Sequence, residues 1–225
     1  MFSTKDTVKV YRATGEHVKY AEEICELVYV SAQERGTGIA KRSPDYIKEK
    51  MLAGKAIVAL DGDKIAGFAY IETWEQKQFV ANSGLIVAHA YRKSGVARRI
   101  KRKIFKLSRK LFPEAKIFSI TTGHAVMKIN YELGFRPVTF SELTSDKDFW
   151  DGCQGCCNYD ILERNNRKMC LCTALLFDPR YKPKRIIRFT RIGTRIKVIN
   201  NKTKDSNLLQ NLVTRNLKTQ WKKLF

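Results

Sequence analysis

The feature that most constrains the fold is a strand, a loop and a helix that follow one another in residues 83–104. Leu85, Ile86 and Val87 form an unbroken apolar run, which is typical of a short buried strand. After a brief turn, Val96 and Ile100 begin an apolar repeat at helical spacing. The chain must therefore place a helix start directly after a buried strand and fold around that junction.

The loop inside this junction reads Arg-Lys-Ser-Gly-Val-Ala over residues 92–97. The start of a helix leaves several backbone N–H groups without intrahelical partners, and the helix dipole makes that end electropositive. Gly95 allows the backbone to come close to a ligand, and the small Ala97 permits tight contact beside it. The loop therefore predicts a socket for a phosphate or pyrophosphate group.

With this loop the chain resembles the GNAT acyltransferases, whose pyrophosphate loop reads Arg/Gln-x-x-Gly-x-Gly/Ala between a strand and a helix. A second segment, Asn-Tyr-Glu-Leu-Gly-Phe at residues 130–135, is similar to the GNAT helix that ends in Tyr-x-x-Gly-Phe and closes over the pantetheine arm. The resemblance covers roughly residues 8–177. It implies an α/β fold with a central mixed sheet flanked by helices, and an acyl-CoA, with acetyl-CoA expected, as the co-substrate.

The periodicity of the whole chain predicts elements in the same order. Strands alternating with helices predict a mixed, partly parallel sheet. Ser43 and Pro44 are expected to open one helix, and Asp61-Gly62-Asp63 to turn a hairpin. We expect a GNAT domain at residues 7–179 and a basic tail at 180–225. The expected strands lie near 8–11, 56–60, 65–71, 79–88, 116–121, 135–140 and 167–177, and the expected helices at 16–32, 43–54, 96–111 and 125–133.

The resemblance also implies which residues contact the co-substrate. In the resembling enzymes a backbone N–H near the end of the strand, here around Val87, binds the thioester carbonyl oxygen and stabilises the tetrahedral oxyanion. His124 stands where the family often has an asparagine that touches the cofactor, so that contact is altered here. The full set of expected cofactor-binding residues is Ile86, Val87, Arg92, Lys93, Ser94, Gly95, Val96, Ala97, His124 and Asn130.

Four side chains compete for the proton-transfer roles. Tyr131 matches the family tyrosine that protonates the departing thiolate, although it could equally pack under the end of its helix. His89 could deprotonate the incoming ammonium or be an ordinary polar residue at a turn. Glu72 and Glu75, after the third strand, are rival bases. The sequence does not choose among these bases.

The acceptor is expected over the first two helices, where the connecting loop carries Arg35, Lys41 and Arg42. Guanidinium groups bind carboxylates bidentately, which favours an acidic acceptor, while a solvated basic loop is the alternative. A fainter resemblance links the chain to GNATs of arginine biosynthesis, which acylate the α-amine of glutamate. The expected activity is therefore an N-acetyltransferase reaction, by direct attack of a primary amine in a ternary complex, with a place in amino-acid biosynthesis.

Six cysteines occur, and four of them have the spacing of a metal site. Cys153 and Cys156 form a Cys-x-x-Cys pair, and Cys170 and Cys172, if they lie on a strand, share one face. Cysteines are also common small core residues, and this spacing is not that of a standard zinc finger. We favour core thiols, with a structural zinc site as the alternative.

Charge and hydropathy set the remaining expectations. No apolar run approaches the length of a membrane span, and no signal-peptide core stands at the start, so a cytoplasmic location and reduced thiols are expected. The net charge is +21, and residues 180–225 carry 14 Lys and Arg against one acid, Asp205. Such a tail is attracted to nucleic acid. The alternative function is therefore nucleic-acid binding by the tail, with a vestigial GNAT core.

Overall fold

The computed structural model describes residues 7–35, 40–181, 191–192 and 195–196. The chain divides into two units, Met1–Tyr181 and Lys182–Phe225. In the second unit the described residues form a hairpin of β8 (Arg191–Ile192) and β9 (Arg195–Ile196). The rest of this unit lies outside the described residues, and with it Leu208, Leu209, Leu212 and Leu217, whose spacing in the sequence indicates a weak helix.

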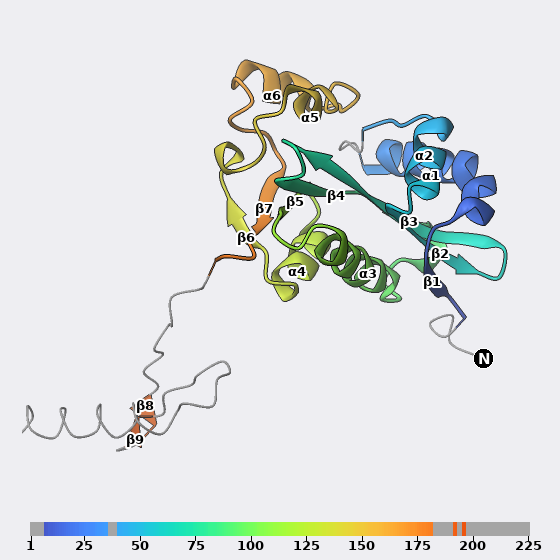
Figure 1. Cartoon of the computed structure of the whole chain (residues 1–225), viewed down its shortest axis with the longest axis horizontal. Helices are drawn as coiled ribbons and strands as arrows, with labels where there is room; N and C mark the ends of the chain where they lie inside the picture. The colour runs from blue at the N-terminus through green and yellow to red at the C-terminus, as the bar shows by residue number, and fades with distance from the viewer. Residues whose placement is uncertain (1–6, 36–39, 182–190, 193–194, 197–225) are drawn as a thin grey trace, which may run out of the picture. The chain divides into compact units, whose positions relative to one another are not determined.

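The first unit is built on a seven-stranded mixed sheet, as the sequence predicts (Figure 1). The pairs of neighbouring strands are antiparallel except β4 and β5, which are parallel. The strand order is β1 (Lys9–Arg12), β2 (Ala56–Asp61), β3 (Lys64–Trp74), β4 (Phe79–Val87), β5 (Lys116–Thr121), β7 (Thr173–Phe177) and β6 (Arg136–Val138).

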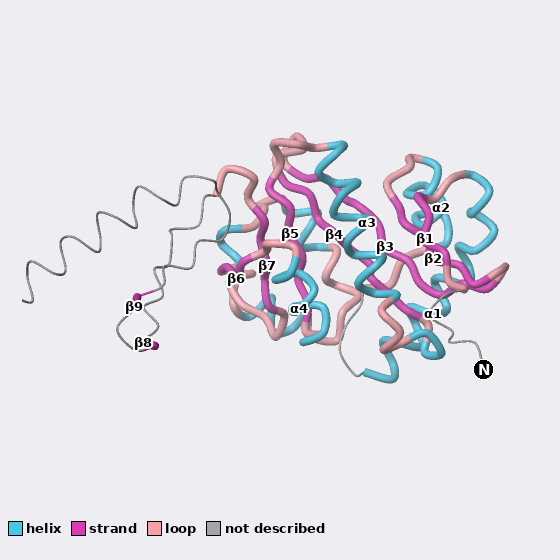
Figure 2. The backbone as a smooth tube through the Cα atoms, turned by 90° about the horizontal axis from the view of Figure 1, so that it is seen from below, coloured by secondary structure: helices cyan, strands magenta, loops and turns pink. Residues whose placement is uncertain are grey.

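Helices cover both faces of this sheet (Figures 1 and 2). One face carries the 3₁₀ helix η1 (Gly15–Tyr20), α1 (Ala21–Arg35) and α2 (Pro44–Leu52). The other carries α3 (Val96–Leu111) and α4 (His124–Glu132). The helix expected from residue 16 thus begins as a 3₁₀ turn and becomes α-helical only at Ala21. Among the described residues, no helix has both the length and the apolar character that crossing a membrane requires.

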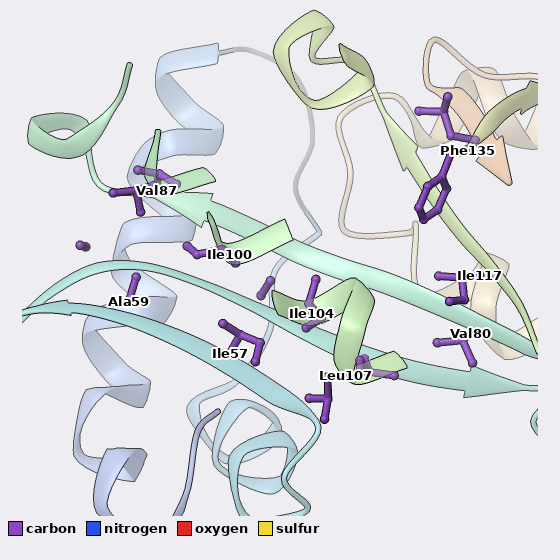
Figure 3. Close-up of a cluster of buried hydrophobic side chains, with 14 of the residues drawn as sticks. Ile57, Ala59, Val80, Val87, Ile100, Ile104, Leu107, Ile117 and Phe135 are labelled. Carbon is purple, nitrogen blue, oxygen red and sulfur yellow. The ribbon is translucent and has the colours of Figure 1, made fainter. Parts of the chain in front are cut away.

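The core under α3 explains why this helix forms where it does. Ile100, Ile104 and Leu107 face Ile57 and Val80 of the sheet, and all five side chains are buried (Figure 3). The opposite face of α3 is exposed and carries Arg99, Arg102, Lys103 and Lys106. Burial of one apolar stripe therefore orients the helix, and its start comes to lie at the end of β4.

Two local signals determine the start of α2 and the β2–β3 hairpin. The Ser43 hydroxyl caps α2 by accepting the N–H of Tyr46 at 3.2 Å, and Pro44 is the first helical residue, as predicted. Gly62 turns the β2–β3 hairpin with a φ of +59°. Both features depend on neighbouring residues alone, and both are confirmed.

A third group of elements lies between β6 and β7. It comprises the 3₁₀ helix η3 (Phe140–Glu142), α5 (Lys147–Asp151) and α6 (Tyr159–Arg164), and it packs Phe149, Trp150 and Leu162 against Phe79 and Phe118 of the sheet. The strand expected over 167–177 begins only at Thr173. Cys170 and Cys172 therefore precede β7 and do not share a strand face, because Asn166 and Arg167 turn the chain with positive φ angles of 50° and 62°. The predicted strand is therefore confirmed for Thr173–Phe177 and was wrong for residues 167–172.

Candidate functional site

The centre of the site is the place where β4 and β5 separate. Their parallel pairing covers only Phe79–Lys116, Val80–Ile117 and Ala81–Phe118, while β4 continues to Val87 and β5 to Thr121. The β3–β4 register shifts at the same level, and Gly84 there has a φ of +63°. A Cβ on Gly84 would stand 2.1 Å from Cε1 of Tyr70, so the close approach requires glycine. The irregularity bends β4 and leaves an opening between the two strands.

The backbone of Val87 faces this opening. The N–H of Ala88 donates to the carbonyl of Ala66 at 3.0 Å, on the β3 side. Because successive residues of a strand direct their backbone groups to opposite sides, the N–H of Val87 points away from β3. By the same alternation Ile86 turns its backbone groups towards β3, where it pairs with Phe68, and its side chain is buried beneath α1 and α2. Of these two expected cofactor contacts, only Val87 is directed at the opening.

The loop at residues 92–97 has the geometry of an open socket at the start of α3. Lys93 and Gly95 adopt left-handed φ angles of 62° and 89°, and the Ser94 hydroxyl donates to the carbonyl of Tyr91 at 2.5 Å. The first helical bond runs from Arg99 N–H to Gly95 C=O at 3.1 Å, so the preceding N–H groups of Val96, Ala97 and Arg98 point out of the helix end. A Cβ on Gly95 would meet nothing within 4 Å. The loop thus leaves space beside an electropositive helix end.

Arg92 contacts the protein on three sides. Its Nη1 pairs with Glu34 at 3.1 Å and its Nη2 donates to the buried Ser31 hydroxyl at 3.1 Å. Its Nε lies 3.4 Å from the carbonyl oxygen of Val87. The guanidinium therefore braces the end of β4 against α1, a structural task that the motif alone did not indicate.

The remaining expected donor-side residues are dispersed. His89 lies in η2 (His89–Tyr91) and is exposed, and His124 is exposed at the start of α4. Tyr131 is 53% exposed, while its neighbour Asn130 is fully buried, with no hydrogen-bond partner for either amide atom. Adjacent helical positions lie about 100° apart, so α4 directs Asn130 inward and Tyr131 outward.

A cavity of about 210 Å³ adjoins the opening. Its walls come from the separated parts of β4 and β5, from Thr122 and Gly123 before α4, and from the region of α5 and α6. The cavity is also lined by Arg42, just before α2, and by every second residue at the end of β3, namely Tyr70, Glu72 and Trp74. The alternation puts these three side chains on one face of the strand.

Glu72 is the carboxylate of this cavity, with 9% of the residue exposed. The Tyr46 hydroxyl donates to its Oε1, and Arg42 Nε donates to the Tyr70 hydroxyl at 3.1 Å. Burial, and then the Glu72 charge, raise the pKa of Tyr70 to about 12 and also raise the pKa of Tyr46, so both phenols stay protonated. Burial by itself lowers the pKa of the Arg42 guanidinium, but the neighbouring Tyr70 and Glu72 raise it, and the net effect is a raised pKa. The cavity wall therefore combines the Glu72 carboxylate, the Arg42 guanidinium and the Tyr70 phenol, and Tyr46 holds the carboxylate by a hydrogen bond.

The rival carboxylate, Glu75, is engaged elsewhere. It accepts hydrogen bonds from the Thr144 hydroxyl at 2.8 Å, from Ser145 N–H at 2.6 Å and from the Ser145 hydroxyl at 3.0 Å. Despite partial burial, these donors lower the pKa of Glu75. Glu75 thus fastens the 144–145 loop, and of the two glutamates Glu72 is the one that lines the cavity.

The sequence reasoning missed Tyr46 and Tyr70. The alternation of Tyr70, Glu72 and Trp74 was a usable signal, since polar and aromatic side chains on one strand face mark a face that is not simple core. Of the expected acceptor residues, Arg42 lines the cavity and Lys41 is exposed. Arg35 ends α1, and its side chain lies outside the described part of the structure.

The four cysteines of the expected metal site all line the cavity. Burial is the main cause that raises the pKa of Cys153 to about 11 and that of Cys172 to about 12. Within the described ranges, no three or more His, Cys, Asp or Glu side chains are placed so that they could hold a metal ion.

Comparisons with known proteins agree with this geometry. Residues 41–135 match the model of the acetyltransferase (GNAT) family. No curated protein sequence matches the chain.

Solved structures share the fold at low sequence identity. N-acetylglutamate synthase from Neisseria gonorrhoeae, complexed with coenzyme A and N-acetyl-glutamate, is 16% identical with a TM-score of 0.56 over 77% of this chain and 35% of its own. A Mycobacterium tuberculosis protein in complex with CoA is 16% identical, with a TM-score of 0.55 over 76% of this chain and 98% of its own. Diaminobutyrate acetyltransferase EctA from Paenibacillus lautus, in complex with L-2,4-diaminobutyric acid and coenzyme A, is 11% identical, with a TM-score of 0.51 over 79% and 98%. This chain thus spans about a third of the Neisseria enzyme chain and nearly the full length of the other two.

Proposed function

We propose that the protein is an N-acetyltransferase that moves an acetyl group from acetyl-CoA to the primary amine of an amino-acid acceptor such as glutamate. The observation that carries the proposal is the opening between β4 and β5, which lies between the open socket at Gly95 and the cavity lined by Arg42 and Glu72. Catalysis requires donor and acceptor to meet in one place, and this opening adjoins both binding regions.

The donor side fits the phosphates and the thioester. The open space at Gly95 and the N–H groups at the start of α3 would hold the pyrophosphate, with Lys93 and Ser94 at its edge. The N–H of Val87 would donate to the thioester oxygen, where charge develops during attack. Arg92 fixes the strand end that carries this donor.

The acceptor side fits an amino acid. Arg42 uses Nε and Nη1 on protein oxygens, and its fork has further N–H groups with which to bind a carboxylate. Glu72, held by Tyr46, would accept a proton from the ammonium group and so free the amine for attack. The Neisseria structure contains N-acetyl-glutamate and the Paenibacillus structure contains L-2,4-diaminobutyric acid, which supports this acceptor class. Tyr131 as the acid, His89 as a second base, and the contacts of Ile86, Val96, Ala97, His124 and Asn130 with the donor remain predictions.

The test is release of free thiol from acetyl-CoA over a panel of amino acids and other amines that includes glutamate. Gly95→Glu puts a side chain and a negative charge into the socket, so it should abolish turnover. Gly62→Glu is the matched control, because Gly62 also has a positive φ of +59° and open space around a Cβ but lies in the β2–β3 hairpin. Turnover with a carboxylate-bearing amine that Gly95→Glu loses and Gly62→Glu keeps would support the proposal. Silence over the panel, with no thermal stabilisation by coenzyme A, would overturn it.

The division into a domain at 7–179 and a basic tail at 180–225 also remains a proposal, as do a role in amino-acid biosynthesis and a cytoplasmic location. Most of the tail lies outside the described residues. Nucleic-acid binding by the tail can be checked from the salt dependence of RNA binding by the full chain and by a chain ending at Pro179. Cell fractionation checks the location.

A further inference from the structure

Two residues that line the cavity beside Glu72 carry buried N–H groups without a hydrogen-bond partner. One group is the indole Nε1 of Trp74, at the end of β3, and the other is the amide Nδ2 of Asn158, directly before α6. Neither nitrogen finds an acceptor among the residues that the structure describes. A buried donor of this kind has lost its hydrogen bonds to water without replacing them, so it marks a place where a bound molecule can supply the acceptor.

Asn158 is held in the wall by its backbone. Its N–H donates to Sγ of Cys156 at 3.5 Å, and its carbonyl oxygen accepts from Leu162 N–H at 3.4 Å and lies 3.7 Å from Sγ of Cys170. The residue is only 8% exposed. Both backbone groups are thus engaged within the segment between β6 and β7, and the amide Nδ2 is left for a ligand.

Trp74 differs from the second indole that lines the cavity. The Trp74 ring packs edge-on against Phe149, with 5.6 Å between the ring centroids, and its N–H is unused. The indole N–H of Trp150, in contrast, donates to the carbonyl oxygen of Thr144 at 2.8 Å. The protein therefore satisfies one of these two indoles and not the other.

The unused donors lie within reach of the proposed base. Trp74 follows Glu72 by two residues on the same strand face, a separation of about 6.6 Å along β3. An amino acid whose amine lies at Glu72 can therefore extend its side chain along the strand to Trp74. The wall around the two donors is largely apolar, with Phe118, Phe149 and Leu162, and hydrogen bonds are strong in such surroundings.

We propose that Trp74 and Asn158 bind the side-chain oxygen of the acceptor and so select amino acids whose side chain ends in a carboxylate or a carboxamide. This inference rests on the proposed function, because it assigns the acceptor side chain within the same cavity. Both donors are neutral, so they recognise an oxygen atom and not a charge. An acceptor without this oxygen leaves both N–H groups unpaired against an apolar chain, which is why the site should reject it.

The test compares kcat/KM for glutamate, glutamine and norvaline, whose apolar side chain completes the same number of carbon atoms, by release of free thiol from acetyl-CoA. The better of glutamate and glutamine should exceed norvaline by at least about 100-fold. Trp74→Phe keeps a ring against Phe149 but removes the N–H, so it should reduce this preference by about 10–100-fold. Asn158→Leu, with a side chain of similar shape, should act in the same way, and kcat/KM for norvaline should change little in both.

Trp150→Phe is the matched control, because it removes from the same cavity wall an indole N–H that already has a partner. It should lower the free energy of unfolding and leave the preference unchanged. The inference would be overturned by a preference that persists in both Trp74→Phe and Asn158→Leu, or that falls equally in Trp150→Phe. Buried water would then satisfy the two donors.

The wild type provides a test that does not depend on the folding of any variant. Norvaline used as well as glutamate and glutamine would overturn this inference and leave the proposed function standing. Silence with every amine, together with no thermal stabilisation by coenzyme A, would overturn the proposed function and this inference with it. The two failures are therefore distinguishable.

Discussion

Replacing Gly84 with alanine tests the irregularity that separates β4 from β5. A left-handed φ of +63° is costly for any residue with a Cβ, by about 1–2 kcal/mol. The new Cβ would also stand 2.1 Å from Cε1 and 2.6 Å from Cδ1 of the Tyr70 ring. This ring is buried and cannot simply turn into solvent, so overpacking adds about 1–3 kcal/mol. We expect the free energy of unfolding to fall by about 2–5 kcal/mol.

Gly62→Ala measures the first contribution, the conformational cost, by itself. Gly62 has a nearly equal φ of +59°, and a Cβ there would meet nothing within 4 Å. Only the conformational cost of about 1–2 kcal/mol should remain. The assay is urea unfolding of both variants, followed by tryptophan fluorescence, with the slope against urea checked for two-state behaviour. Equal losses in the two variants, within about 0.5 kcal/mol, would refute the reasoning that Tyr70 and β4 are packed this closely.

Two further predictions concern charged groups. Glu72→Gln should lower kcat by about 10²–10⁴-fold, because the amide cannot accept the proton of the acceptor amine. Glu75→Gln should leave kcat near the wild-type value. Equal losses of kcat in both variants would contradict the assignment of Glu72 as the base. Lys101 is almost completely buried, its Nζ has no hydrogen-bond partner among the described residues, and burial lowers its pKa to about 7. Between about pH 7 and pH 10.5, Lys101 is protonated in the unfolded chain but neutral in the folded protein. The free energy of unfolding should therefore rise with pH over this range, by at most about 1.4 kcal/mol per pH unit. Lys101→Met should flatten this rise and stabilise the protein near pH 7. The measurement is urea unfolding from pH 6.5 to 9.5. If the free energy of unfolding depends on pH in the variant as it does in the wild type, the ammonium group is solvated and the reasoning fails.

Much of the donor side could be predicted from the sequence because it depends on residues that are neighbours in the chain. The apolar run at 85–87, the glycine of the loop and the helical repeat from Val96 lie within 20 residues. Each acts through local sterics or through burial of one apolar stripe, so the strand and the helix are confirmed. The phosphate socket stays a prediction. The cap at Ser43 and the hairpin at Gly62 were predicted for the same reason.

The tertiary structure alone decided which candidate side chains meet. Asn130 and Tyr131 are adjacent in the sequence, but packing of α4 buries the first and exposes the second. Glu72 and Glu75 are three residues apart, yet Glu72 lies in a buried strand face and Glu75 is bound by a loop some 70 residues away in the chain.

The four cysteines that line the cavity show the same limit. The sequence determined that Cys153 and Cys156 share a turn, whereas the convergence of that turn with Cys170 and Cys172 follows from the packing of the segment between β6 and β7 onto the sheet. Local patterns thus determined the elements and the donor loop. Burial against distant strands decided the acceptor cavity, because the free energy of burying a side chain depends on neighbours that the local sequence does not contain.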